Sequence, residues 1–175
     1  MRYVIAALIA TLAVAPATAA DSPASVRIDL KNSTGASVGS ATVSDAPNGA
    51  LLHIEAKGLP PGWHGLHFHE TGDCSKADFT SAGGHVHAMA TKVHGLMNPD
   101  ANEAGDLPNL YVGADGSATV DLFSNYVSLH GAGNRPALMD KDGSALVIHA
   151  NPDDYKSQPI GGAGARIACG VIPGG

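Results

Sequence analysis

The sequence has few aromatic residues, only two cysteines, no long apolar run and no cluster of basic residues. Aromatics make up 5% of its 175 residues. No run reaches the ~20 apolar residues of a transmembrane helix, so we expect no stable membrane insertion of the mature protein. The 10 basic side chains are outnumbered by 16 acidic ones, for a formal net charge of −6. A nucleic-acid partner is not expected, because such partners require basic patches.

The first twenty residues have the pattern of a secretory signal peptide. MRYVIAALIATLAVAPATAA carries one arginine, a short apolar run and an A-x-A cleavage signal. We therefore predict that residues 1–20 are a signal peptide and that residues 21–175 form a single domain. The predicted destination is the periplasm.

Export has a consequence for the two cysteines, Cys74 and Cys169. A pair of cysteines in an oxidising compartment is expected to form a disulfide. On the chain-entropy model, closing so long a loop is worth roughly 4 to 5 kcal/mol. The negative net charge has a consequence too, because an anionic substrate would be repelled at long range and would need a local positive focus.

Short alternating runs of apolar and polar residues predict an all-β fold. SVRIDLKN places Val26, Ile28 and Leu30 on one face, and LLHIEAKG has the same alternation. Further strands are expected in NLYVGADGSATVDLF on both sides of an Asp115-Gly116 turn, in SALVIHA and in ARIACGVI. Breaks at Gly, Pro, Asn and Asp favour an antiparallel sandwich or barrel.

Two long polar segments interrupt this pattern, at residues 71–108 and 151–164. Loops of this length inside a compact domain are usually functional. Both follow predicted strands that carry histidines.

The chain has nine histidines, and most of them form one constellation. His67 and His69 are two apart, so on an extended strand both imidazoles project from one face. An H-x-H pair alone is not diagnostic, because many such histidines are simply packed or solvated. Other candidate ligands follow along the chain: His85, His87, His94, Asp106 and His149. Several imidazoles plus a carboxylate suit copper or zinc rather than calcium or magnesium.

Seven motifs, in order, resemble the copper–zinc superoxide dismutases of the bacterial secreted type. They are HGLHFH, GDC, SAGGH, KVHG, GDLPNL, LVIHANPDD and GGAGARIACGVI. The resemblance covers the chain from about residue 26 to 172. The resemblance implies an eight-stranded antiparallel Greek-key barrel or sandwich with two long functional loops. This expectation agrees with the independent prediction of short alternating strands.

The resemblance also implies a role for each matched residue. The implied copper ligands are His67, His69, His85 and His149. The implied zinc ligands include His85, as the bridge between the metals, together with His94 and Asp106. Cys74 and Cys169 match the family's disulfide. Arg166 matches the arginine that attracts and orients superoxide, Asp153 resembles an aspartate linking the two sets of histidines, and His64 resembles a supporting histidine that bonds loop backbone.

The implied activity is the conversion of superoxide to oxygen and hydrogen peroxide by cycling between Cu(II) and Cu(I). Imidazole ligands tolerate both copper states. The implied catalytic residues are His85, which would carry a proton, and Arg166, which would supply the positive focus that the net charge lacks. The alternative is a copper-binding or storage protein of the same fold without turnover, for which Arg166 would have no use. A homodimer is possible, although no interface can be identified from the sequence.

One ligand position departs from the family pattern. Three residues before Asp106, where the family has a third zinc histidine, this chain has Glu103. Glu103 could itself bind zinc, since glutamate is a known zinc ligand. Alternatively His87 fills the position, or zinc binds weakly or not at all. The sequence leaves these three interpretations open.

Overall fold

The computed structural model describes residues 24–175. The predicted signal peptide and the predicted cleavage region at residues 20–21 lie outside the described residues. Within the described part of the chain, no helix is long and apolar enough to cross a membrane.

Nine strands and one short 3-10 helix make up the regular structure of residues 24–175. They are β1 (Ser25–Asn32), β2 (Ser37–Ala46), β3 (Gly49–Ala56), β4 (Gly62–His64), β5 (Leu66–His69), η1 (Thr80–Ala82), β6 (Leu110–Val112), β7 (Ala118–Ser124), β8 (Ser144–His149) and β9 (Arg166–Ile172). The expected number of strands was eight. The difference arises because only Gly65 separates β4 from β5, so that one bent strand counts as two.

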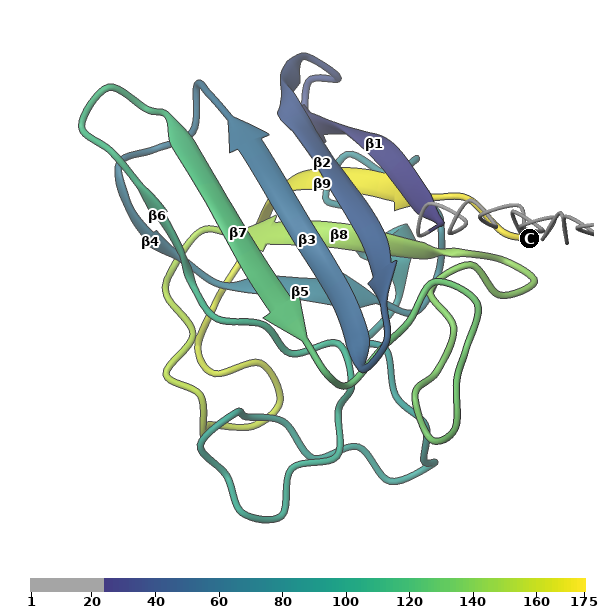
Figure 1. Cartoon of the computed structure of the whole chain (residues 1–175). Helices are drawn as coiled ribbons and strands as arrows, with labels where there is room; N and C mark the ends of the chain where they lie inside the picture. Colours follow the sequence, from purple (N-terminus) through teal and green to yellow (C-terminus); the bar gives the residue numbers. More distant parts are fainter. Residues whose placement is uncertain (1–23) are drawn as a thin grey trace, which may run out of the picture.

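The strands form a curled antiparallel sheet. Seven of them pair in the order β5-β8-β9-β1-β2-β3-β7, and β4 pairs with β6 in a small second sheet. Since β4 runs into β5 and β6 is followed by β7, the small sheet connects the two edges of the large one. Figure 1 shows β1, β2, β3 and β7 in front, crossing β5, β8 and β9 behind. The predicted all-β class is confirmed.

Alternation along the strands explains the core. In β1, Ile28 and Leu30 are buried while Arg27 and Asp29 are exposed, and in β3 Leu52 is buried while its neighbour Leu51 is not. The buried apolar side chains form one large cluster between the layers. The alternating runs in β1 and β3 therefore lie where the sequence predicted strands.

Strand β8 does not alternate, because both of its faces are covered. All six of its residues are buried. Leu146 and Ile148 belong to the large core, whereas Ala145 and Val147 pack in a second cluster under the loop that contains η1. Burial on both faces is typical of strands that read as continuous apolar runs.

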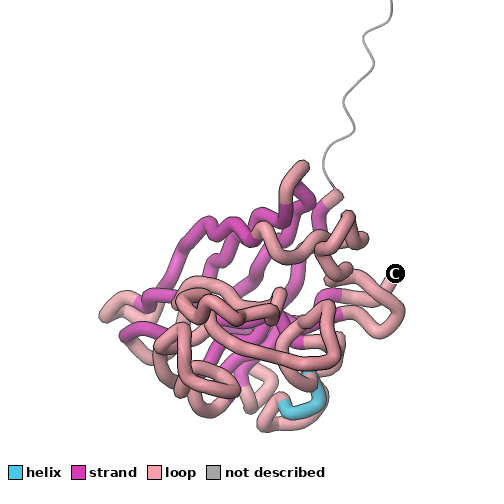
Figure 2. Tube along the Cα trace, turned by 90° about the horizontal axis from the view of Figure 1, so that it is seen from below, coloured by secondary structure: helices cyan, strands magenta, loops and turns pink. Residues whose placement is uncertain are grey.

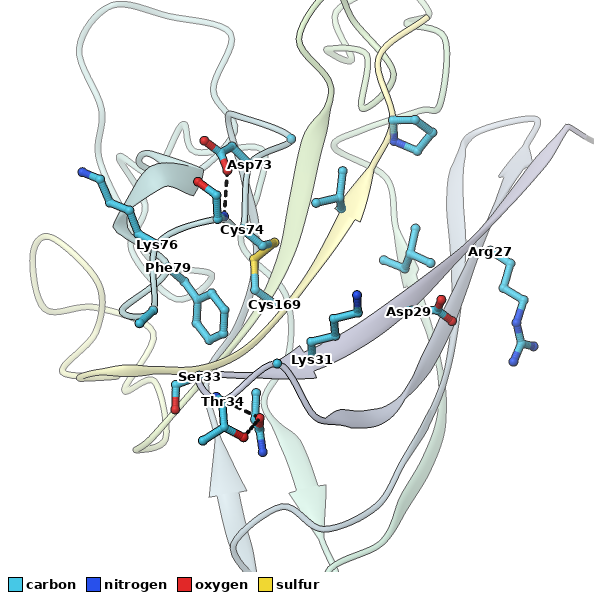
Figure 3. A pocket seen from close by; sticks show the side chains of 18 residues that line it. Arg27, Asp29, Lys31, Ser33, Thr34, Asp73, Cys74, Lys76, Phe79 and Cys169 are labelled. Atoms are coloured by element: carbon cyan, nitrogen blue, oxygen red, sulfur yellow. Dashed lines mark hydrogen bonds between the residues drawn. A yellow bond between two sulfur atoms is a disulfide. The ribbon is translucent and has the colours of Figure 1, made fainter.

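The two long loops lie at the same end of the barrel, below the strands in Figure 1 and facing the viewer in Figure 2. The predicted disulfide is confirmed: Cys74, in the first loop, is bonded to Cys169 on β9. Figure 3 shows this bond beside Phe79, next to a surface cavity that Lys31 also lines. The disulfide fastens the first loop to the back layer of the barrel.

Candidate metal centre

Four histidines converge on the outer face of β5 and β8. His67 and His69 alternate with the core residues Leu66 and Phe68, so both imidazoles point away from the core. His149 ends β8, which pairs with β5. His85 joins them from the first loop, and one ligand nitrogen from each of the four lies within 4.8 Å of the others. All four residues are buried.

Each of these four imidazoles has one nitrogen without a hydrogen-bond partner. Six buried side-chain nitrogen or oxygen atoms of residues 24–175 lack a partner. Four of them belong to this group: His67 Nδ1, His69 Nε2, His85 Nε2 and His149 Nε2. Buried polar atoms are rarely left unpaired. Four of them on four converging rings form a donor set that fits a metal ion, and a set of imidazoles suits copper.

In three of the four rings, the second nitrogen makes a hydrogen bond, and this bond leaves the first nitrogen free to bind a metal. His69 Nδ1 donates to the carbonyl oxygen of Gly83 at 2.9 Å, and His149 Nδ1 donates to that of Gly164 at 3.0 Å. His67 Nε2 donates to a carboxylate oxygen of Asp153 at 2.8 Å. Because each acceptor requires a proton on its nitrogen, the opposite nitrogen keeps its lone pair.

Burial keeps three of these rings neutral. It lowers the pKa of His67 to about 4, against the opposing effect of Asp153. Burial lowers the pKa of His149 to about 3, and neighbouring histidines contribute in the same direction. The pKa of His69 is lowered as well, chiefly by burial. Neutral imidazole is the form that binds metals.

A second group lies on the other side of His85. Its Nδ1 is 2.8 Å from Glu103 Oε2 and 2.9 Å from Asp106 Oδ1. His94 Nδ1 is 3.2 Å and 3.0 Å from the same two oxygen atoms. By distance, the second possible metal group is His67, His85, His94 and Asp106. Imidazoles with carboxylates form a donor set that suits zinc.

The ionisable side chains of the second group shift one another's pKa values. Burial alone would lower the pKa of His94, but Asp106, Asp153 and Glu103 outweigh it and raise the pKa to about 11. The pKa of His85 is also raised, because Asp106 and Glu103 outweigh its burial. The carboxyl pKa values of Glu103 and Asp106 are lowered by these histidines, against burial. Two imidazole rings and two carboxylates thus contact one another where a divalent ion would fit.

Asp153 connects the two groups. One carboxylate oxygen accepts from His67, and the other lies 3.1 Å from His94 Nε2. Burial raises the pKa of Asp153, but the two histidines outweigh it and keep the pKa low. Asp153 therefore lies between the two histidines.

His64 and His87 lie outside both groups. The two ring nitrogens of His64 are 2.7 Å and 2.8 Å from the carbonyl oxygens of His149 and Pro60. The Nδ1 of His87 is 3.0 Å from the carbonyl oxygen of His85 and 3.3 Å from a carboxylate oxygen of Glu70. Of Glu103 and His87, it is therefore Glu103 whose side chain contacts His94.

Arg166 lies beside the copper-type group and is fastened to the first loop. Its guanidinium donates to the carbonyl oxygens of Phe79 and Gly83. Arg166, His69 and His85 line one surface cavity, which we call the copper-side cavity. Its lining consists of His69, Gly84, His85, Lys92, Glu103, Gln158, Pro159, Ile160 and Arg166. Two of the four converging histidines, His69 and His85, therefore border the same cavity as the guanidinium of Arg166.

The sequence did not single out Glu70, Lys92 or the backbone carbonyl of Gly83. Gly83 accepts from both His69 and Arg166, so one peptide group orients two functional side chains. A backbone carbonyl has no side-chain signature. The only sequence signal near Glu70 is its position directly after His69.

Comparisons with known proteins agree with this geometry. A family model described as copper/zinc superoxide dismutase (SODC) matches residues 37–172. A copper–zinc superoxide dismutase of Caulobacter vibrioides is 64% identical over 143 residues, which cover 82% of this chain and 82% of that protein. Copper–zinc superoxide dismutase 1 of Salmonella typhimurium is 36% identical over 98% of this chain and 99% of that protein.

Solved structures show the same similarity. A double mutant of a superoxide-dismutase-like protein from Bacillus subtilis matches with a TM-score of 0.80 and 42% identity, covering 85% of this chain and 97% of that one. The copper/zinc superoxide dismutase from Brucella abortus matches with a TM-score of 0.69 and 31% identity, covering 85% of this chain and 99% of that one.

Proposed function

Because the chain belongs to the copper/zinc superoxide dismutase family, with superoxide as substrate and copper and zinc as cofactors, we propose a role for each residue of the metal centre. The observation that carries the proposal is the set of four unpartnered nitrogens on four converging, buried imidazoles. Copper, when bound, supplies the one-electron couple that oxidises one superoxide to oxygen and reduces a second to hydrogen peroxide.

The proposed copper ligands are His67 Nδ1 and the Nε2 atoms of His69, His85 and His149. Three of the rings are oriented by hydrogen bonds from their other nitrogen to Asp153, Gly83 and Gly164. Such supporting bonds hold the ligand tautomer and the ring orientation. His67 also lies near the second group, but we assign it to copper because its Nε2 is paired with Asp153.

The proposed zinc ligands are His85 Nδ1, His94 Nδ1, an oxygen of Asp106 and Glu103 Oε2. The contacts of Glu103 with His85 and His94 support its inclusion, and glutamate is an ordinary zinc ligand. His87 is left out because its ring bonds the backbone of His85 and lies near Glu70.

His85 and Arg166 are the proposed catalytic residues. His85 Nε2 is the ring nitrogen that can hold a proton on the copper side, while its Nδ1 is held by the carboxylates of the second group. Arg166 supplies a fixed positive charge beside the copper-side cavity, which offsets the net negative charge of the protein for an incoming anion. The buried surroundings exclude bulk water from the rings.

The decisive experiment is metal analysis with a dismutation assay on the purified protein and on Glu103→Gln and Glu103→His. We expect copper and zinc close to one equivalent each in the wild type. Glu103→Gln, of nearly identical shape, should weaken zinc binding by about tenfold or more, because it removes a charged ligand. Glu103→His should keep zinc.

Two outcomes would contradict this assignment. Unchanged zinc affinity in Glu103→Gln would exclude Glu103 as a ligand. Copper loading without superoxide dismutation would favour the alternative, a copper-binding or storage protein.

We also propose that residues 1–20 direct the protein to the periplasm. The support is the pattern of the N-terminal sequence, the Cys74–Cys169 disulfide and the bacterial origin of the relatives. Cell fractionation with N-terminal sequencing of the mature chain tests this: an N-terminus near Asp21 is expected, and an uncut cytoplasmic protein would contradict it. A homodimer stays a prediction, for light scattering to test.

A further inference from the structure

A cavity of about 600 Å³ lies between the first long loop and the loop that joins β7 to β8. Its lining comes from residues 88–106 on one side and from residues 125–135 on the other. Both segments extend below the strands in Figure 1. Among the described residues of this lining, Arg135 alone carries a positive charge, and we call the site the Arg135 cavity. A volume of this size is typical of small-molecule sites.

The guanidinium of Arg135 has no partner within residues 24–175. Its Nε is buried and makes no hydrogen bond, and no carboxylate lies within ion-pair distance of it. Glu103 and Asp106 also line the cavity, but their ion pairs are with His85 and His94. Buried polar atoms are rarely left without a partner, so this donor is available to a ligand.

The backbone fixes the place from which the Arg135 side chain starts. Arg135 donates to the carbonyl oxygen of Ala132 at 3.1 Å and accepts from its N–H at 3.2 Å, across a tight turn in which Gly133 has a φ of 60°. The same loop is fastened to β2, because the N–H of Leu129 donates to Oδ1 of Asp45 at 2.6 Å. A site that is already ordered loses less free energy on binding.

The remaining lining combines apolar side chains with amides. Tyr126 and Leu96 are 49% and 37% exposed, and Pro99 lies in the same lining. The amides belong to four asparagines: Asn98, Asn102, Asn125 and Asn134. Exposed aromatic and aliphatic side chains around one cation suit a ligand with a flat apolar body and an acidic group.

The charges of the lining favour a ligand with one negative charge over a ligand with two. A guanidinium pairs through two parallel hydrogen bonds with either a carboxylate or a phosphate. Glu103 and Asp106 lie in the same lining, and they repel a doubly charged phosphate ester more strongly than a singly charged carboxylate. A carboxylate is therefore the better match.

We propose that the Arg135 cavity binds a small carboxylic acid with an aromatic or similarly flat apolar body. The carboxylate pairs with the guanidinium of Arg135, and the apolar body packs against Tyr126. Of its lining, only Glu103 is shared with the copper-side cavity. The inference does not rest on the proposed dismutation.

The test measures binding of benzoate to the copper- and zinc-loaded protein by ligand NMR, with copper kept as Cu(I) so that the signals stay sharp. We expect saturation below about 20 mM. Benzamide, which is neutral and of nearly the same shape, and phenyl phosphate should each bind about fivefold more weakly or worse. Absence of saturation, or equal affinities for benzoate and benzamide, would overturn the proposal. Tighter binding of phenyl phosphate would overturn the ligand class.

Arg135→Met keeps the length of the side chain and removes its charge. It should weaken benzoate binding by about fivefold or more and leave benzamide binding unchanged. Arg27→Met and Arg166→Met are the matched controls, because Arg27 lines the cavity beside the disulfide and Arg166 lines the copper-side cavity. Both should keep the wild-type affinity for benzoate. An equal loss in either control would place the benzoate in another cavity and overturn the proposal.

Tyr126→Ala is a second, independent variant. Because Tyr126 is half-exposed, its truncation should not prevent folding. It should weaken benzoate and benzamide alike, by about threefold, since both present the same ring. Unchanged affinity for benzoate would overturn the packing of the ligand against Tyr126. Binding is measured without turnover, so that a protein without dismutase activity would still test the cavity.

Discussion

The functional side chains depend on single hydrogen bonds that leave a chosen nitrogen free. His69 and His149 each donate Nδ1 to one backbone carbonyl, and this leaves both Nε2 atoms for a metal. The sequence could predict which histidines converge, through the family resemblance and the H-x-H spacing. It could not predict these tautomers, because the acceptors are backbone atoms of loops.

Arg166→Met should lower kcat/KM by about tenfold or more at low salt, since it removes a fixed charge beside the copper-side cavity. Steady-state kinetics at several salt concentrations would measure this, together with the slope against ionic strength. Arg166→Lys is the control, because it keeps a charge that can still reach a carbonyl. Equal activity of Arg166→Met and the wild type would show that this arginine does not guide the substrate.

At the scale of elements, the strands with strict alternation were predictable and the others less so. β1 matches the run SVRIDLKN residue for residue, whereas β2 was not singled out because Ser, Gly, Thr and Ala dilute its pattern. The extents of the loops followed from their Gly, Pro, Asn and Asp content. Their course did not, because it depends on distant contacts such as the Cys74–Cys169 bond and the Gly83 carbonyl.

Gly105 shows how closely the first loop lies against β5. A Cβ atom at this position would lie 2.2 Å from the carbonyl oxygen of Phe68 and 2.8 Å from the N–H nitrogen of Val86. Gly105→Ala must therefore displace the backbone next to Asp106. We expect a loss of stability of about 1 to 3 kcal/mol and weaker zinc binding, measured by urea unfolding and by zinc titration.

Gly113→Ala is the matched control for Gly105→Ala. Its Cβ would meet a side-chain oxygen of Asp115 at 3.0 Å, and that group can move. We expect a smaller loss of stability and no change in zinc affinity. Similar zinc affinities in both variants would mean that the backbone at Gly105 does not position Asp106.

At the scale of the whole molecule, the buried neutral histidines make the metal-free protein sensitive to acid. His67 has a folded pKa of about 4 against 6.5 in the unfolded chain. The unfolded state therefore binds a proton first, and the stability present above pH 6.5 is lost as the pH falls toward 4. His67 alone accounts for about 3 kcal/mol of this loss, and His149, with a pKa of about 3, adds to it.

His94 does not offset this loss of stability on acidification. His94 has a raised pKa of about 11, so its contribution is complete below pH 6.5 and is lost only as the pH rises through 11. Urea unfolding of the metal-free protein between pH 7 and pH 4 measures the effect. His67→Asn should flatten the dependence, and a wild type whose stability is constant or increases on acidification would contradict it.

Asp153 has a consequence for how the protein responds to metal supply. Its carboxylate connects His67 on one side with His94 on the other, in addition to the connection through His85. If occupancy of one site shifts this carboxylate, the affinity of the other changes, and linkage requires the same factor in both directions. Asp153→Asn should reduce both factors together. In the wild type, by contrast, scarcity of either ion would weaken the retention of the other. The protein would therefore lose its metals cooperatively rather than one at a time.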